Sequence, residues 1–208
     1  AAMSHDVRTP LTALMGQAES LAISAQLNSE QKVLAESIRQ EARELSTLVG
    51  NLLEMARLES GQVELRLEWQ SVEELIGSAI RAARHALGSV KVGTRVPDEL
   101  PLVEFDAGLM ERVLVNLLEN AVKYGSSIPP HSPVVEISVM ATANNLELRV
   151  RDFGAGLPAS SRGREDKLFE KFTRGSSESS TRGVGLGLAI CKAIVDAHKG
   201  RISARNAE

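Results

Sequence analysis

The chain has one cysteine, no long apolar run and no excess of basic residues, and each shortage excludes a class of protein. Cys191 has no second cysteine to pair with, so no disulfide can form within the chain. No apolar stretch approaches the roughly 18 to 20 residues that cross a bilayer, and no signal peptide is recognisable. The net charge of −3 provides no basic surface for nucleic acid. We therefore expect no direct nucleic-acid partner, and a reducing compartment in which Cys191 is a small buried core residue.

The composition that is present is typical of a globular protein with two modest domains. The 208 residues are 43% hydrophobic and 25% charged, and domains average about 100 to 200 residues. A change of pattern near residue 61 predicts one unit over residues 1–61 and another over residues 62–208. Because the first helical pattern is already under way at residue 1, we expect this chain to be a soluble fragment of a longer parent.

The first unit has the pattern of two antiparallel helices. Apolar residues recur at alternating spacings of four and three along residues 7–21 and again along residues 34–55, as in a seam that faces a partner helix. Asn28 with Gln31, or Ser29 alone, can cap the second helix. A two-helix hairpin buries little apolar surface, so we expect a homodimer in which two hairpins form a four-helix bundle. A plain coiled-coil dimeriser would show the same pattern.

His5 lies off this apolar seam. The periodicity therefore predicts that it faces solvent, which argues against a role as an ordinary core histidine. Pro10 removes a backbone donor and crowds the preceding turn, so it should bend the helix just beyond His5. A bend beside a reactive side chain can open space for a partner.

The second unit mixes strands and helices. Alternating apolar residues predict strands at residues 63–67, 90–96, 102–105, 135–139 and 146–150, with a further strand starting at Ile202. Helices are predicted at residues 71–87, with Ser71 and Glu74 as a capping box, at residues 109–124 after the cap Asp106, and at residues 187–198, ended by Gly200. Residues 153–182 are rich in Gly, Ser and Arg, and a loop of that length is usually functional or mobile.

Two glycine clusters flank this long loop. Asp152, Gly154 and Gly156 follow a strand, where glycines let the backbone approach a flat ligand while the carboxylate accepts from an exocyclic amine. A second cluster directly precedes a helix, so its N–H groups suit a phosphate chain; it consists of Gly183, Gly185 and Gly187. It is not a Walker loop, because no Gly-Lys-Ser/Thr follows. Either cluster taken singly could also be an ordinary flexible loop.

A third polar cluster lies on the predicted helix 109–124. Asn116, Asn120 and Lys123 are spaced by four and three residues and therefore share one face. Amide oxygens together with phosphate oxygens and waters suit Mg²⁺, and Lys123 can neutralise phosphate charge. The simpler interpretation is ordinary solvated helix polarity. We favour a function, because asparagine has a poor helix propensity and occurs twice on this face.

Five segments, in this order, closely resemble the H, N, G1, F and G2 boxes of bacterial sensor histidine kinases. They are residues 5–10, 116–124, 152–156, 169–172 and 183–188. Within that family, residues 11–19, 68–69 and 189–196 are most similar to the potassium-responsive KdpD kinases. The resemblance covers nearly the whole chain.

The resemblance implies a fold of the α plus α/β class. Residues 1–61 would be the dimerisation and histidine-phosphotransfer hairpin, and residues 62–208 the catalytic ATP-binding domain, an α/β sandwich of the GHKL (Bergerat) type. Carried over by residue, the resemblance implies that Asp152 would hold the adenine amine and that Tyr124 would pack near the base. Asn120 would ligate Mg²⁺, Asn116 would support the phosphate site, and Lys123 and Arg174 would contact phosphates. Phe169 and Phe172 would dock a lid formed by residues 157–184, and the binding boxes would include the glycines at 154, 156, 183, 185 and 187.

For such a kinase we expect neutral His5 to attack the γ-phosphate of Mg-ATP through Nε2, while Asp6 accepts from Nδ1–H. The phosphoryl group would pass to an aspartate of a KdpE-like response regulator. Thr9 would orient a water in a phosphatase mode, or is simply a helix-surface residue. The parent would be a bacterial inner-membrane sensor whose cytoplasmic portion includes this chain, with membrane contact only through segments outside it.

Two other classes stay open. The chain could be an ATPase or serine kinase that shares only the nucleotide domain, which a stable phosphohistidine would exclude. It could also be a degenerate kinase that acts as a dimeric scaffold and senses nucleotide without catalysis, which a binding assay with a turnover check would distinguish.

Overall fold

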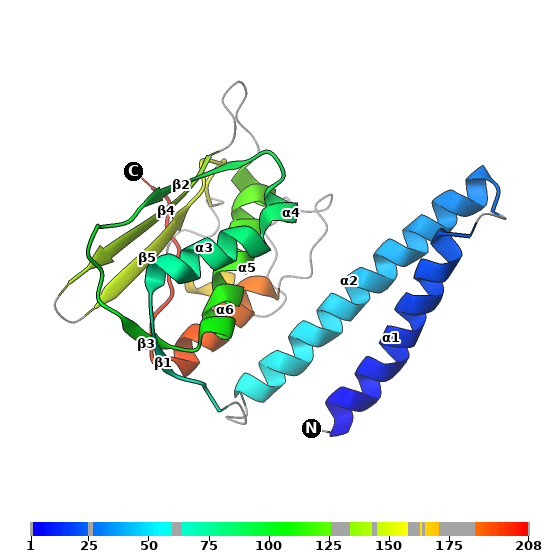
Figure 1. Cartoon of the computed structure of the whole chain (residues 1–208), viewed down its shortest axis with the longest axis horizontal. Helices are drawn as coiled ribbons and strands as arrows, with labels where there is room; N and C mark the ends of the chain where they lie inside the picture. The colour runs from blue at the N-terminus through cyan, green and yellow to red at the C-terminus, as the bar shows by residue number, and fades with distance from the viewer. Residues whose placement is uncertain are drawn as a thin grey trace. The chain divides into compact units, whose positions relative to one another are not determined.

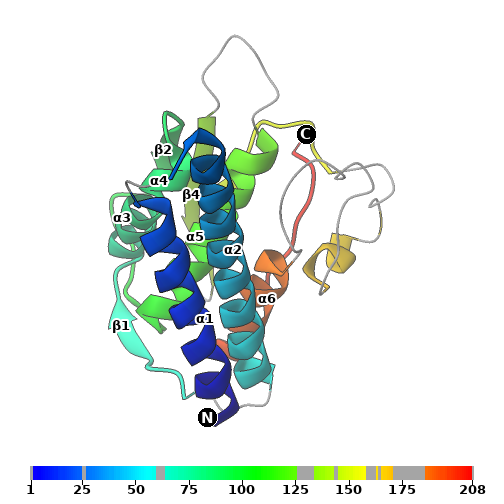
Figure 2. The ribbon, with the colours of Figure 1, turned by 90° about the vertical axis from the view of Figure 1, so that its right-hand side faces the viewer.

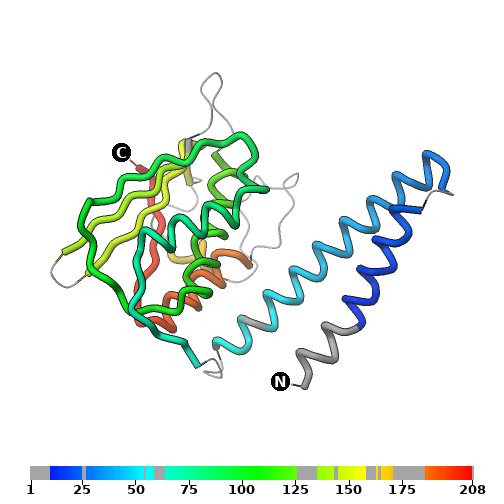
Figure 3. Tube along the Cα trace, in the orientation of Figure 1, coloured from blue at the N-terminus to red at the C-terminus, as the bar shows by residue number. Residues whose placement is uncertain are grey.

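The computed structural model describes residues 2–24, 27–59, 64–125, 134–142, 145–157, 163, 165–170 and 186–207. The chain divides into two compact units, Ala1–Gln62 and Val63–Glu208. Figure 1 shows the first unit in blue to cyan and the second in green to red, and Figure 3 follows the same path as a Cα trace. Among the described residues, no helix combines the length and the apolar character needed to cross a membrane.

The first unit is an antiparallel hairpin of α1 (Ala2–Ala22) and α2 (Ser29–Glu59) (Figure 1). The predicted cap of α2 is confirmed, because the Asn28 N–H donates to Gln31 Oε1 at 3.0 Å and the Gln31 N–H donates to Asn28 Oδ1 at 2.9 Å. The alternative that Ser29 caps alone is wrong. An ion pair of 2.7 Å between Arg43 and Glu19 joins the two helices.

The predicted apolar seam accounts for only part of the contact between α1 and α2. Small side chains are buried there, with Ala18, Ala35 and Ala42 each at most 4% exposed. Most of the larger seam residues remain 42% to 62% exposed: Leu14, Leu21, Leu34, Ile38, Leu45 and Leu52. The alanines let the two backbones approach, so the leucine-rich stripe faces outward from a single hairpin.

The second unit contains two small sheets and four α-helices among its described residues. One sheet pairs β1 (Glu68–Gln70) antiparallel with β3 (Val103–Phe105). The other has the order β2 (Lys91–Arg95), β4 (Val134–Ala141) and β5 (Leu146–Arg151), with β2 parallel and β5 antiparallel to β4. The helices are α3 (Val72–Ala82), α4 (Arg84–Leu87), α5 (Ala107–Gly125) and α6 (Gly187–Ala197), and a 3₁₀ helix, η2, covers Glu165–Phe169.

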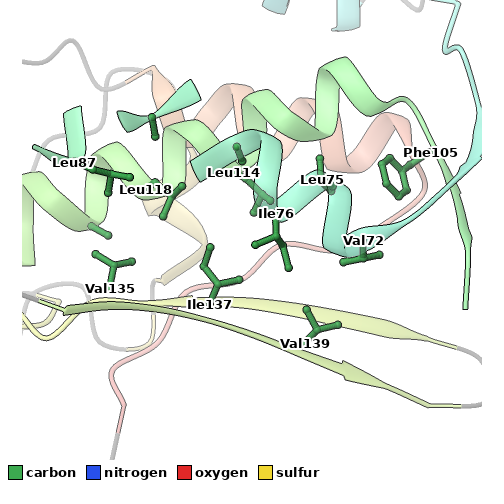
Figure 4. Packing of buried hydrophobic residues seen from close by; sticks show 13 residues of the cluster. Val72, Leu75, Ile76, Leu87, Phe105, Leu114, Leu118, Val135, Ile137 and Val139 are labelled. Atoms are coloured by element: carbon green, nitrogen blue, oxygen red, sulfur yellow. The ribbon is translucent and has the colours of Figure 1, made fainter. Parts of the chain in front are cut away.

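The core of this unit lies between the three-stranded sheet and the layer formed by α3 and α5 (Figure 4). Strand β4 alternates as its sequence predicts, and Val135, Ile137 and Val139 are at most 3% exposed. Leu114 and Leu118 of α5 pack onto this face and are at most 1% exposed. Each such side chain contributes roughly 1.5–3 kcal/mol by leaving water. The predicted α/β sandwich is confirmed.

Three predicted boundaries are wrong. Residues 64–67 form no strand, and β1 begins only at Glu68. Within residues 64–67, the Arg66 N–H donates to the carboxylate of Asp106 at 3.0 Å instead of to a neighbouring strand. The helix predicted over residues 71–87 breaks at Ala83 into α3 and α4. Residues 201–207 form no strand, so the one predicted from Ile202 is absent.

The end of α6 also differs from the prediction, because Lys199 rather than Gly200 takes the left-handed conformation, with φ of 57°. The Lys199 N–H donates to Asp196 O and the Gly200 N–H donates to Val195 O, both at 2.9 Å. This pair of bonds is a Schellman motif. A Cβ at Gly200 would lie 3.0 Å from Val195 Cγ1, which explains a glycine there.

Candidate functional site

The three polar residues predicted on one helix face lie on α5. Asn116, Asn120 and Lys123 are all partly buried. The Asn116 side chain is oriented by its amide nitrogen, which donates to Arg112 O at 3.0 Å, one turn earlier. That bond uses the donor end of the carboxamide and leaves Oδ1 as an acceptor on the face shared with Asn120.

The N-terminus of α6 lies against this face of α5. A Cβ at Gly187 would be 3.2 Å from Asn116 Oδ1 and 4.0 Å from Asn120 Nδ2, so glycine is what lets the two helices approach here. The N-cap residue Leu186 makes no side-chain cap hydrogen bond. The first backbone N–H groups of α6 therefore lie close to two asparagines and can donate hydrogen bonds to a bound anion. Figure 2 shows α5 and α6 in the turned view.

The loop after β5 packs against the C-terminal end of α5. The Gly154 N–H donates to Asp152 Oδ1 at 2.9 Å, which leaves the second carboxylate oxygen of Asp152 as an acceptor. A Cβ at Gly154 would lie only 2.3 Å from Tyr124 O and 3.0 Å from Gly125 Cα. No side chain fits in that space, so the glycine at 154 is required by the approach of two backbones.

The last turn of α5 adds a cation and an aromatic ring next to this loop. Lys123 Nζ lies 4.9 Å from the centre of the Tyr124 ring, within cation–π range, and Tyr124 is 41% exposed. At the end of β5, the Arg151 guanidinium lies 4.8 Å from the centre of the ring of Phe153, a residue of this loop. Two cation–ring pairs thus lie in sequence on either side of the contact between the Asp152 loop and α5.

Gly156 and Phe169 occupy the outer parts of this region. Gly156 has φ of +75°, and a Cβ there would be 2.8 Å from Oδ1 of Asn206. Phe169 ends η2, is 6% exposed, and η2 packs on α6. Asn206 was not found from the sequence, because no motif marks a lone asparagine 49 residues after its partner Leu157.

Several predicted residues cannot be placed. Phe172, Arg174, Gly183 and Gly185 lie outside the described residues, as does most of the proposed lid. His5, Asp6 and Thr9 belong to α1, but their side chains also lie outside the described part of the chain.

Burial changes the acidity of groups between and beside these helices. Burial raises the pKa of the Cys191 thiol to about 12, so it stays protonated at neutral pH and is not a nucleophile. With an exposure of 0% it is the buried core residue that the sequence predicts. Desolvation lowers the pKa of Arg112 and raises the pKa of Glu119, the residue before Asn120 in α5.

A hollow of about 640 Å³ lies elsewhere in this unit, between the N-terminal halves of α3 and α5. Its lining includes the acidic residues Glu73, Glu74 and Glu111, the basic residue Arg81 and the aromatic residue Phe105. Its lining includes none of the predicted site residues. We therefore place the candidate site along α5, between the contact of Gly187 with Asn116 and the contact of the Asp152 loop with Tyr124.

Two family models match the chain. Residues 105–208 match the histidine kinase-, DNA gyrase B- and HSP90-like ATPase model. Residues 1–61 match the His Kinase A (phospho-acceptor) domain model. The first match includes α5, the Asp152 loop and α6, and the second includes α1 and α2.

Relatives and solved structures resemble the chain over nearly its full length. The sensor protein KdpD of Escherichia coli (strain K12) is 47% identical over 207 residues, which cover 99% of this chain and 22% of KdpD. The structure of full-length ShkA in complex with AMPPNP is 29% identical, with a TM-score of 0.76, and covers 98% of this chain and 41% of ShkA. Histidine kinase ThkA, in complex with response regulator protein TrrA, is 22% identical with a TM-score of 0.67 over 100% of this chain and 57% of ThkA, and shows the fold alone. The chain thus spans about a fifth of the length of its curated relative KdpD.

Proposed function

Because the chain belongs to the family of histidine kinase-, DNA gyrase B- and HSP90-like ATPases and carries a His Kinase A domain before it, we propose that it phosphorylates its own His5 with ATP. The phosphoryl group then passes to an aspartate of a response regulator. The observation that carries this proposal is that the acceptor carboxylate of Asp152 lies beside the C-terminal end of α5, and the glycine N-terminus of α6 lies against the middle of the same helix, at Asn116 and Asn120.

The Asp152 end suits the adenine base of ATP. One oxygen of Asp152 accepts the Gly154 N–H, and the other is available to the exocyclic amine of adenine. Tyr124 offers an exposed ring edge for the base, and Gly154 brings loop backbone onto α5 without a side chain between. Gly156 allows the loop to turn away again.

The part of the site at the N-terminus of α6, beside Asn116 and Asn120, suits the phosphates and a magnesium ion. Asn120 would ligate Mg²⁺ with its side-chain oxygen, Asn116 would support the phosphate site, and the N–H groups at Gly187 would donate to phosphate oxygens. When bound, Mg²⁺ neutralises charge on the β- and γ-phosphate oxygens. Among the described residues there is no cluster of three or more acidic, histidine or cysteine side chains that could hold a metal ion.

The remaining box residues complete this site in the proposal. Lys123 and Arg174 contact phosphates, Gly183 and Gly185 extend the phosphate-binding turn, and Phe169 and Phe172 dock the lid. Of these, Phe169 already packs through η2 onto α6, the helix whose N-terminus would hold the phosphates.

In the transfer step, the lone pair of His5 Nε2 attacks the γ-phosphorus, an N–P bond forms, and the bond to the β–γ bridging oxygen breaks with ADP as the leaving group. Asp6 accepts the Nδ1–H hydrogen bond and stabilises the imidazolium that forms. Thr9, one turn later on α1, would orient the water that removes phosphate from the regulator in a phosphatase mode.

We infer two protein partners. The outward stripe of leucines on α1 and α2 leaves apolar surface that a second copy would cover, so we propose a homodimer with a four-helix bundle. A response regulator is the proposed acceptor, because residues 1–61 match the His Kinase A (phospho-acceptor) domain model. Because the KdpD relative is 47% identical, we propose a KdpE-like regulator, a role in potassium or osmotic regulation, and a membrane-bound parent with this portion in the cytoplasm.

The test is incubation of the chain with γ-labelled ATP and Mg²⁺, followed by acid and alkali treatment. We expect acid-labile, alkali-stable label on the wild type, no label on His5→Gln, and full label on His85→Gln, an exposed histidine of the second unit. Label that survives acid would indicate a serine or threonine kinase. ATP binding without label, in a dimer, would support the scaffold and contradict the proposed activity.

A further inference from the structure

The loop that follows β5 is held at two points by different parts of the fold. Its first half rests on the end of α5, where Gly154 meets Tyr124 O. Its second half meets the C-terminal segment, where the Leu157 N–H donates to Asn206 Oδ1 at 2.7 Å. Figures 1 and 2 both show the red C-terminal segment passing beside the yellow end of β5 and the loop after it.

The same Asn206 oxygen also lies against Gly156. A Cβ at residue 156 would be 2.8 Å from Oδ1 and 3.4 Å from Cγ of Asn206, and Gly156 has φ of +75°. The carboxamide therefore fills the place of a side chain at Gly156 and accepts a hydrogen bond from the next residue. Two neighbouring residues of the loop are fixed by one side chain.

We propose that Asn206 is a positioning residue of the nucleotide site, which holds the loop of residues 152–157 in the conformation that binds adenine. This inference rests on the proposed function of Asp152. A loop that contains Gly154 and Gly156 has much conformational freedom to lose on binding, and a loop already held at both ends loses less. Asn206 touches Gly156 and Leu157 of the loop and is not proposed to contact the reacting phosphate, so its effect is on nucleotide affinity and not on the transfer step.

The chemistry of the contact separates an acceptor role from mere space filling. Aspartate has the shape of asparagine and keeps an oxygen at the same place, so Asn206→Asp retains the bond from the Leu157 N–H. Leucine fills a similar volume without an acceptor, and alanine removes both. Ser203→Ala alters an exposed residue of the same segment and serves as the matched control.

The experiment measures autophosphorylation by the whole chain at varied ATP, together with amide hydrogen exchange of Leu157 in the nucleotide-free protein. Loss of one hydrogen bond predicts that Asn206→Ala and Asn206→Leu raise KM for ATP and speed Leu157 exchange by about threefold to tenfold, with kcat changed less than about twofold. Asn206→Asp and Ser203→Ala should stay within about twofold of the wild type in both measurements.

Two results would overturn the inference. Unchanged KM and exchange in Asn206→Ala would show that the bond does not hold the loop, and an Asp variant as impaired as the Leu variant would show that the acceptor is not what matters. Asp152→Asn keeps the two failures apart. If the wild type and Asp152→Asn bind AMPPNP equally, the proposed adenine site is wrong and the role of Asn206 falls with it; if only Asp152→Asn loses binding, the site stands and Asn206 alone is in error.

Discussion

Replacement of Gly154 by alanine should push the loop after β5 off α5. The added Cβ would lie 2.3 Å from Tyr124 O and 3.0 Å from both Asp152 Oδ1 and Gly125 Cα. Since a relaxed C···O contact is about 3.3–3.6 Å, the loop must move by about 1 Å. Two of the three atoms belong to the backbone of α5, so no rotamer change relieves the overlap. Overpacking of this kind costs about 1–3 kcal/mol.

The effect on binding should exceed the effect on stability. A displacement of about 1 Å at a site that orients a ligand can cost up to about 100-fold, and Asp152 moves with the loop. We therefore expect Gly154→Ala to lower the free energy of unfolding by about 2 kcal/mol, measured as a lower midpoint in urea. We also expect it to weaken AMPPNP binding by at least about tenfold.

Two other glycines of the second unit provide matched controls. At Gly187 the nearest atom to a new Cβ is the end of the Asn116 side chain at 3.2 Å, which can give way, so Gly187→Ala should cost under about 1 kcal/mol of stability yet weaken nucleotide binding. At Gly108 the nearest atom is 3.6 Å away, an ordinary contact, and alanine should be neutral or stabilise α5 by up to about 1 kcal/mol. Equal urea midpoints and equal AMPPNP affinities for Gly154→Ala and Gly108→Ala would refute the reasoning.

Three further predictions concern single side chains. Burial raises the pKa of the Cys191 thiol from the ordinary 9.0 to about 12, so as the pH rises the unfolded chain releases this proton before the folded chain does. The free energy of unfolding should therefore fall above about pH 9, by up to about 1.4 kcal/mol per pH unit. Urea unfolding of Cys191→Ala at the same pH values should lack this fall. His198 accepts from the Asp106 N–H at 3.0 Å through Nε2, with Nδ1 2.8 Å from Ile194 O, so His198→Ala should cost about 1–3 kcal/mol in thermal unfolding. Asn28→Ala removes a reciprocal cap and should cost α2 about 1 kcal/mol, measured by urea unfolding followed by helical circular dichroism.

Features that depend on neighbours in the sequence could be predicted. The cap of α2 joins Asn28 to Gln31, and the cap of α5 joins Asp106 to Leu109, each across three residues. The side-chain alternation of β4 needs only the period of a strand and one covered face. In each case the interacting groups lie within one turn or one strand, so the pattern alone carries the information.

Features that depend on partners far away in the sequence could not be predicted. Residues 64–67 alternate as a strand does, but the Arg66 N–H is taken by Asp106, 40 residues later. Lys199 ends α6 in a conformation usually given to glycine, while Gly200 is small because Val195 lies against it. A local pattern records which residue types are present and not which atoms from elsewhere compete for their hydrogen bonds and space.

The candidate site combines both kinds of information. The spacing of Asn116, Asn120 and Lys123 predicts one helix face, but only the fold shows that Gly187 meets this face near Asn116 and that Gly154 meets the same helix at Tyr124. Since an α-helix rises 1.5 Å per residue, the separation of eight positions from Asn116 to Tyr124 sets these two contacts about 12 Å apart along the axis. The other side of helix α5 is buried in the core through Leu114 and Leu118, so the helix fixes the distance between the place proposed for the base and the place proposed for the phosphates. The glycines are then required wherever another backbone must reach that helix, and this is why each glycine cluster, read alone, was compatible with an ordinary loop.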